Sequence, residues 1–247
     1  MKKVGIITAM RVEARCITPL RLPFNQRFSL GESAAIWLCG MGEEAAREAA
    51  EGLIMGGARA LISFGFAGAL DSSLRPGHLI LPESIHAGHS LQVDLSWRDS
   101  LRQCLPGHLR IAGGVLASSR NMLTSAIVKL ELAQATGACA VDMESGAVAE
   151  VAAHAGVPFL TIRAISDPVD FSPPPLLLDA VRPDGSADLA RLLPLLVRGS
   201  LEVGTLFRLA MGSRAACAAL SAMVRHADAE MGIRTRNIAS PHGYVSD

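Results

Sequence analysis

Short apolar runs rich in β-branched residues alternate with helical patterns along most of this chain, and this alternation restricts its fold more than any other feature. We expect strands at residues 4–8, 34–39, 60–64, 78–81, 110–116, 138–141 and 158–164. Helical patterns lie at residues 43–55, 124–135, 145–155, 187–197 and 200–224. Such alternation predicts an α/β fold with a central mixed, mostly parallel sheet between layers of helices.

Length and composition indicate one globular domain. The chain has 247 residues, which suits a single α/β domain, and we expect a catalytic domain at residues 1–225 and a polar tail at residues 226–247. The 23 basic and 23 acidic side chains cancel, and aromatic residues make up only 4%. Nucleic-acid binding usually needs a basic surface and stacking aromatics, so we expect no nucleic-acid partner.

The cysteines and the apolar runs indicate a cytoplasmic protein. Five cysteines are scattered without zinc-type spacing, which is typical of reduced thiols in a cytosolic protein. The first apolar run is soon interrupted by charges, unlike a signal peptide. No uninterrupted apolar run reaches the length of about 18 residues that suggests a transmembrane helix.

Two carboxylates lie where apolar runs meet a change of chain direction. The strand expected at residues 158–164 runs into Ser166 and Asp167, and Glu144 begins an alanine-rich helix with Asp142 as a candidate N-cap. The carboxyl ends of strands in an open α/β sheet are where ligands bind. Two acids at one such edge suggest acid–base chemistry. Glu13, soon after the first strand, reads by itself as a solvated acid in the first turn of a helix.

Three other patterns carry weaker signals. The segment Gly40-Met41-Gly42 has the glycines of a dinucleotide-binding turn, but no acid follows at the required distance, so a short tight turn is the better interpretation. His86 and His89 lack a third metal ligand nearby, and we expect no metal site. Ser118 and Ser119 lack a histidine at a recognisable spacing, which argues against a serine nucleophile.

Four segments together resemble the nucleoside phosphorylase family, most of all its methylthioadenosine/S-adenosylhomocysteine nucleosidases. They are GIITAMRVE at residues 5–13, GFAG at 65–68, VDME at 141–144 and RAISD at 163–167. Their order and spacing match the family over about residues 4–170. The region after Asp167 is more similar to hopanoid-associated members, which act on adenosylhopane.

The resemblance implies a role for each acid. The residue matching Asp167 protonates purine N7, the one matching Glu144 binds the ribose hydroxyls, and the one matching Glu13 activates water. The matching segments also imply substrate contacts, which come from Ala9, Gly65, Phe66, Ala67, Gly68, Met143 and Ser166. We expect residues 65–68 to form a turn that lines the side of the nucleophile.

The chain differs from the family at positions near the nucleophile and the base. Phe66 replaces a serine, and Ser63 stands where phosphorylases have an arginine. Arg11 stands where nucleosidases often have an acid, and it could hold an anion. Residues 118–122 replace an acidic and aromatic segment, where Met122 could substitute for the aromatic contact to the purine.

We therefore expect cleavage of the N-glycosidic bond of a purine ribonucleoside, an adenosine modified at its 5′ position. Hydrolysis is favoured over phosphorolysis, in which phosphate would be the co-substrate, and no cofactor is implied. A non-catalytic nucleoside sensor is the alternative from another class. Prolines and leucines after Asp167, with the apolar C-terminal helices, would suit a lipid-like 5′ group. The family also implies a homodimer or a larger homo-oligomer.

Overall fold

The computed structural model describes residues 3–171 and 202–233, and between these ranges residues 174, 180, 182, 184, 186, 188, 190, 191 and 194. The leucines at 176–178 and most of the helix expected at residues 187–197 lie outside the described residues. The strands and helices that hold the candidate site lie within residues 3–171, and the helix at residues 203–227 packs against the last of these strands.

A mixed sheet forms the centre of the molecule. Its strands are β1 (Val4–Thr8), β2 (Arg27–Leu30), β3 (Ala34–Leu38), β4 (Ala60–Ala69), β5 (Leu79–Ile80), β6 (Ser84–His86), β7 (Ser90–Gln92), β8 (Ile111–Ala112), β9 (Val115–Ser118), β10 (Ala138–Asp142) and β11 (Phe159–Asp167). The main path runs β2-β3-β1-β4-β10-β9-β6-β7, and β11 lies between β4 and β5. Six of the ten pairings between described strands are parallel, so the expected mixed, mostly parallel sheet is confirmed.

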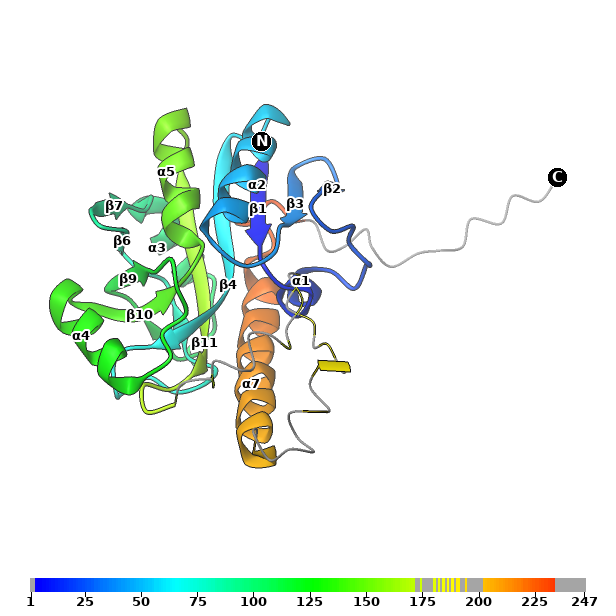
Figure 1. Ribbon diagram of the computed structural model, residues 1–247. Helices are drawn as coiled ribbons and strands as arrows, with labels where there is room; N and C mark the ends of the chain where they lie inside the picture. Colours follow the sequence, from blue (N-terminus) through cyan, green and yellow to red (C-terminus); the bar gives the residue numbers. More distant parts are fainter. Residues whose placement is uncertain are drawn as a thin grey trace.

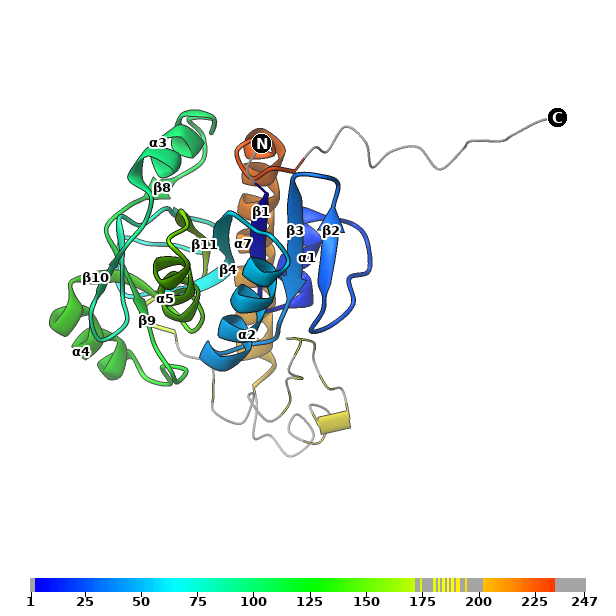
Figure 2. The same ribbon diagram turned by 90° about the horizontal axis from the view of Figure 1, so that it is seen from above.

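Helices cover both faces of this sheet (Figures 1 and 2). The helices are α1 (Arg11–Ile17), α2 (Glu43–Met55), α3 (Leu95–Gln103), α4 (Ala126–Thr136), α5 (Ser145–Ala155) and α7 (Val203–Ala227). One core packs α1 and α7 against the strands, and a second packs α2 and α5 against the opposite face. Because both faces are covered, central strands such as β1 are buried at every position.

The expected turn at residues 65–68 is wrong, because these residues continue strand β4 to Ala69. The neighbouring β11 pairs with β4 as far as Gly68, and β10 pairs with Gly68 and Ala69 from the other side. Hydrogen bonding to two neighbours keeps this segment extended despite its glycines. The strand expected at residues 110–116 is instead divided into β8 and β9.

Packing continues past the domain boundary expected at residue 225. Helix α7 ends at Ala227, and Met231 and Ile233 are buried in the same core as α7. Residues 234–247 lie outside the described residues. Among the helices that the structure describes, none is both long and apolar enough to cross a membrane.

Candidate active site

A cavity opens at the carboxyl ends of β1, β10 and β11, beside the last residues of strand β4. It brings together four acids from four elements or their ends, namely Glu13, Asp142, Glu144 and Asp167. Other expected substrate contacts also line it: Ala9, Phe66, Ala67, Gly68, Met122, Met143 and Ser166. The cavity therefore joins residues that are up to about 160 positions apart in the sequence.

Glu13 is buried at 2% exposure, so its interpretation as a solvated helix acid is wrong. One carboxylate oxygen, Oε2, accepts hydrogen bonds from the Thr8 hydroxyl at 3.0 Å and the Met10 backbone N–H at 2.9 Å. The other oxygen, Oε1, accepts from the backbone N–H of Phe66 at 2.8 Å. Burial raises the pKa of Glu13, while the charge of Arg163 and these hydrogen bonds oppose the rise.

Two glycines of β4 leave room for these acids. A Cβ on Gly65 would collide with the carboxylate of Glu13 and the guanidinium of Arg163, which is the register partner of Gly65 on β11. A Cβ on Gly68 would lie 2.9 Å from Oδ2 of Asp167. Gly68 lines the cavity, whereas Gly65 lies behind Glu13 and outside the lining. These positions need small residues because charged side chains approach the backbone closely.

Glu144 occupies the N-cap position of α5 and is buried at 8% exposure. Its Oε1 accepts a hydrogen bond of 2.9 Å from the backbone N–H of Gly42, whose φ of 102° is one that glycine adopts readily. Burial raises the pKa of Glu144 to about 7, although Arg163 opposes the rise. The tight turn expected at residues 40–42 therefore serves to hold an acid of the site.

Arg163 is the buried cation behind these acids, and our sequence reasoning missed its role. It lies 2.6 Å from Asp142 and 3.7 Å from Glu144, and it donates to the Ser63 hydroxyl at 2.7 Å. The sequence did contain a signal for this role, which is an arginine inside an otherwise apolar strand. A buried charge needs partners of opposite charge, so acids were to be expected beside it. Asp142 is not the N-cap residue that we expected, but its carboxylate accepts from the first helical N–H, that of Ser145.

Asp167 lies at the end of β11 and is held by two donors. Its Oδ1 accepts a 2.8 Å hydrogen bond from the Ser166 hydroxyl, and its Oδ2 lies 2.6 Å from the ammonium of Lys129. Lys129 comes from α4 and is 1% exposed. We did not identify Lys129 from the sequence, although it is the only lysine beyond residue 3.

A protein-family model, that of the phosphorylase superfamily, matches residues 3–198. The chain belongs to the phosphorylase superfamily. This membership confirms the expected family and an enzyme that acts on nucleosides. No curated protein is similar enough in sequence to count as a match.

Solved structures that resemble this superfamily member include three bacterial enzymes. A 5′-methylthioadenosine/S-adenosylhomocysteine nucleosidase from Neisseria meningitidis, bound to methylthio-immucillin-A, is 19% identical with a TM-score of 0.68, covering 94% of this chain and 98% of that one. The Helicobacter pylori nucleosidase with 5′-methylthioadenosine in its active site is 19% identical with a TM-score of 0.64, covering 91% and 99%. Futalosine hydrolase of Helicobacter pylori is 20% identical with a TM-score of 0.65, covering 91% and 97%. These likenesses support the fold.

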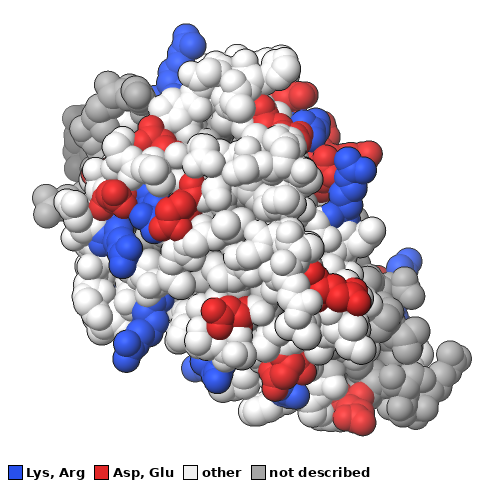
Figure 3. Space-filling view, turned by 90° about the vertical axis from the view of Figure 1, so that its left-hand side faces the viewer, with Lys and Arg blue, Asp and Glu red and all other residues white. Residues whose placement is uncertain are grey.

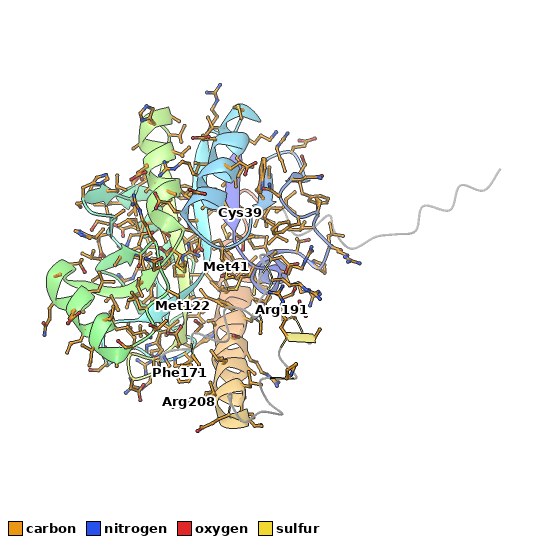
Figure 4. All side chains as sticks on the ribbon, in the orientation of Figure 1. Cys39, Met41, Met122, Phe171, Arg191 and Arg208 are labelled. Atoms are coloured by element: carbon orange, nitrogen blue, oxygen red, sulfur yellow. The ribbon has the colours of Figure 1, made fainter. Side chains whose placement is uncertain are left out.

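Apolar side chains form the remaining walls of the cavity in this superfamily member. Four methionines line it, namely Met10, Met41, Met122 and Met143, together with Phe66. Met41 comes from the turn before α2 and Met122 from the loop before α4, and Figure 4 shows the two near the centre of the molecule. Methionine is flexible and polarizable, so such walls adapt to apolar groups of different shape.

Arg11, like Gly65, is an expected site residue that lies outside this cavity. Its side chain is paired with Asp184 at 2.5 Å and donates to the carbonyl of Leu22 at 3.2 Å. Its guanidinium is therefore already engaged by other groups of the chain.

Ser118 accepts a hydrogen bond from the Gly146 N–H. Among the described residues, no group of three or more His, Cys, Asp or Glu side chains is arranged so that it could hold a metal ion.

Proposed function

We propose that this enzyme hydrolyses the N-glycosidic bond of a purine ribonucleoside and releases the free base. The observation that carries the proposal is the presence of Glu13, Glu144 and Asp167 in one cavity with largely apolar walls. Departure of a purine needs a proton on the base, while the sugar gains positive charge as the bond breaks. Separate carboxyl groups can serve these two needs.

In this proposal Asp167 is the general acid that protonates N7 of the base. Glu144 binds the ribose hydroxyls and stabilises the positive charge of the sugar. Glu13 accepts a proton from the attacking water, with Phe66 N–H and Met10 N–H holding its carboxylate in place. Burial raises the pKa of Glu13, which makes its carboxylate a stronger proton acceptor.

The charges of the cavity favour water over phosphate as the nucleophile. Among the described lining residues, Lys129 is the only basic one, and it is already paired with Asp167. Arg163 is likewise bound to Asp142 and Ser63. A phosphate dianion would meet several carboxyl groups without a free cation to hold it, and like charges repel. Hydrolysis is therefore the version that we propose.

The substrate in this proposal is an adenosine with an apolar group at the 5′ position. The methionines of the cavity walls support it, because they would contact an alkyl or thioalkyl group without needing hydrogen bonds. Methylthioadenosine and adenosylhopane belong to this class, and adenosylhomocysteine shares the thioalkyl part but ends in charged groups. Two of the three structural relatives named above are bound to 5′-methylthioadenosine and to methylthio-immucillin-A, respectively.

Product analysis tests this proposal directly. Purified enzyme is incubated with adenosine, methylthioadenosine and a long-chain 5′-alkyl adenosine, with and without phosphate. We expect free adenine and the free pentose, at the highest kcat/KM for an apolar 5′ group. Ribose 1-phosphate products would overturn hydrolysis, and equal use of adenosine would overturn the 5′ preference. Tight binding without base release would indicate the sensor instead.

The Asp167→Asn variant tests the assignment of the acid. We expect it to bind the nucleoside but to release adenine at least 100-fold more slowly, because general acid catalysis contributes about 10²–10⁴-fold. Arg120→Gln is the control, since Arg120 is 84% exposed and pairs only with Glu43 at 3.0 Å among the described residues. Near wild-type turnover in Asp167→Asn would refute the assigned role.

We also propose that the enzyme is a cytoplasmic homo-oligomer. Large apolar side chains are exposed on α4, where Ile127 is 70% and Leu130 is 53% exposed, and on α7 at Phe207. Figure 3 shows the side of the molecule on which α4 lies, at the left of Figure 1. A broad uncharged area lies there between scattered charges. Exposed apolar patches often mark protein interfaces. Light scattering after size-exclusion chromatography would show a monomer if this proposal is wrong.

A further inference from the structure

Lys129 is an unusual residue in this chain, both in its type and in its place. The sequence has 23 basic residues, but its only lysines are Lys2, Lys3 and Lys129. Arginine therefore serves almost everywhere, and the single internal lysine is 1% exposed beside Asp167. Burying an ammonium is costly unless partners compensate it, so this position has a specific requirement.

The ammonium of Lys129 has three acceptors. It lies 2.6 Å from Oδ2 of Asp167, 2.8 Å from the carbonyl oxygen of Phe171 and 3.2 Å from that of Pro168. An ammonium has three N–H donors, so each acceptor takes one and none remains for a substrate. Lys129 therefore acts on Asp167 and on the chain that follows it, and not on the nucleoside.

The same contacts connect three elements at the end of the cavity where Asp167 lies, which is the end proposed for the purine base. Lys129 belongs to α4, while Asp167 ends β11 and Phe171 lies four residues later. The guanidinium of Arg208, on α7, lies 4.6 Å from the centre of the Phe171 ring, and Figure 4 shows these two side chains close together. Arg208 also lies 4.0 Å from Asp170. The direction of the chain after Asp167 is thus set from both sides.

We propose that Lys129 is a positioning residue for the carboxyl group that serves the purine base. It fixes the orientation of Asp167 together with the Ser166 hydroxyl, because its ammonium lies 2.6 Å from Oδ2 and the hydroxyl donates to Oδ1. This inference rests on the proposed function, because it assumes that Asp167 faces the base. The nearby charges are Asp170 and Arg208 on the α7 side, with Glu13 and Glu144 across the cavity.

The chemistry of lysine explains why arginine does not replace it here. Three acceptors on different sides suit the compact, tetrahedral ammonium, whereas the flat guanidinium matches acceptors that lie in one plane. Arginine would keep the charge but would lose this geometry. A methionine would keep the approximate length of the side chain but would lose both the positive charge and the three N–H donors.

Kinetics of Lys129→Met and Lys129→Arg separate positioning from a general structural role. In Lys129→Met we expect kcat to fall at least tenfold with less than about a threefold change in KM, since orientation of a general acid acts at the transition state. Lys129→Arg keeps the positive charge, so it should restore part of kcat and leave KM unchanged.

The matched control is Lys3→Met, which removes a lysine far from the cavity and should leave kcat and KM unchanged. Wild-type kcat in Lys129→Met, or a KM that rises in step with the loss of kcat, would overturn the proposal. If wild-type enzyme releases no base from any nucleoside, the proposed function fails instead. The following measurement does not depend on turnover or on folding of the Lys129 variants.

NMR of the enzyme labelled only at its lysines reads the contact directly. Three lysines give few signals, so the ammonium of Lys129 can be assigned by comparison with Lys3→Met. We expect a slowly exchanging ammonium signal that shifts in Asp167→Asn, because that variant loses the charged acceptor. A signal that exchanges as fast as those of the N-terminal lysines, or that ignores Asp167→Asn, would overturn the proposed pairing.

Discussion

The guanidinium of Arg163 lies 2.6 Å from the carboxylate of Asp142, and each side chain is only 1% exposed. Arg163 also faces Glu144 at 3.7 Å, so one buried cation serves two acids that are close in sequence. Asp142 neutralises Arg163, and this leaves Glu144 with a pKa of about 7 where burial dominates. The ion pair thus supports the site without being the group assigned to the chemistry.

Breaking this pair should be costly for stability. We expect Asp142→Asn to lower the free energy of unfolding by about 3–5 kcal/mol, because it leaves a buried guanidinium without its nearest countercharge. Chemical denaturation measures this loss. The control Arg120→Gln breaks an exposed pair with Glu43 and should cost only about 0–1 kcal/mol. Equal losses in the two variants would contradict the assigned importance of burial.

The raised pKa of Glu144 predicts a pH dependence of stability. Between the ordinary value of 4.5 and about 7, folded Glu144 holds a proton that the unfolded chain has released. The contribution of Glu144 to the free energy of unfolding is therefore fully present below pH 4.5 and is lost as pH rises through about 7. Glu144→Gln should remove this part of the slope, which is at most about 1.4 kcal/mol per pH unit for one proton. Unchanged slopes in urea titrations from pH 4.5 to 8 would refute the shift.

Gly65 tests how tightly Glu13 is placed. A methyl group at Gly65 would collide with the carboxylate of Glu13, so we expect Gly65→Ala to reduce base release by about 100-fold through displacement of that group. Gly107→Ala is the matched control, because a Cβ there meets no atom within 4 Å. Steady-state kinetics on both variants makes the comparison. Similar kcat/KM values for the two would show that Glu13 tolerates displacement.

Two glycines of α7 should respond in opposite ways. A Cβ on Gly212 would collide with the carbonyl oxygen of Ser166, whereas a Cβ on Gly204 meets nothing within 4 Å. We expect Gly212→Ala to cost about 1–3 kcal/mol by forcing α7 away from β11. Gly204→Ala should stabilise the protein by up to about 1 kcal/mol through helix propensity. Thermal unfolding that moves both variants in the same direction would contradict this packing.

Strong local patterns predicted the elements that the structure contains. The helices at residues 43–55 and 145–155 and the strand at residues 4–8 have the expected bounds, because capping glycines and apolar runs mark them. Shorter or more polar elements, such as β2, β6 and β7, gave no clear pattern. The segment at residues 65–68 was mistaken for a turn because glycine weakens a strand locally, while pairing on both sides keeps it extended.

The sequence by itself predicted the α/β class and pointed to Glu144 and Asp167 at the ends of recognisable elements, whereas the superfamily and the role of Glu13 came from its resemblance to a known family. Only the tertiary structure decided which cations and N–H groups meet those acids. Gly42 binds Glu144 across 102 residues, and Lys129 reaches Asp167 from a different helix. Such partners come together through the folding of distant segments. Local patterns carry no information about these distances, because the contacts join residues that are far apart in the sequence.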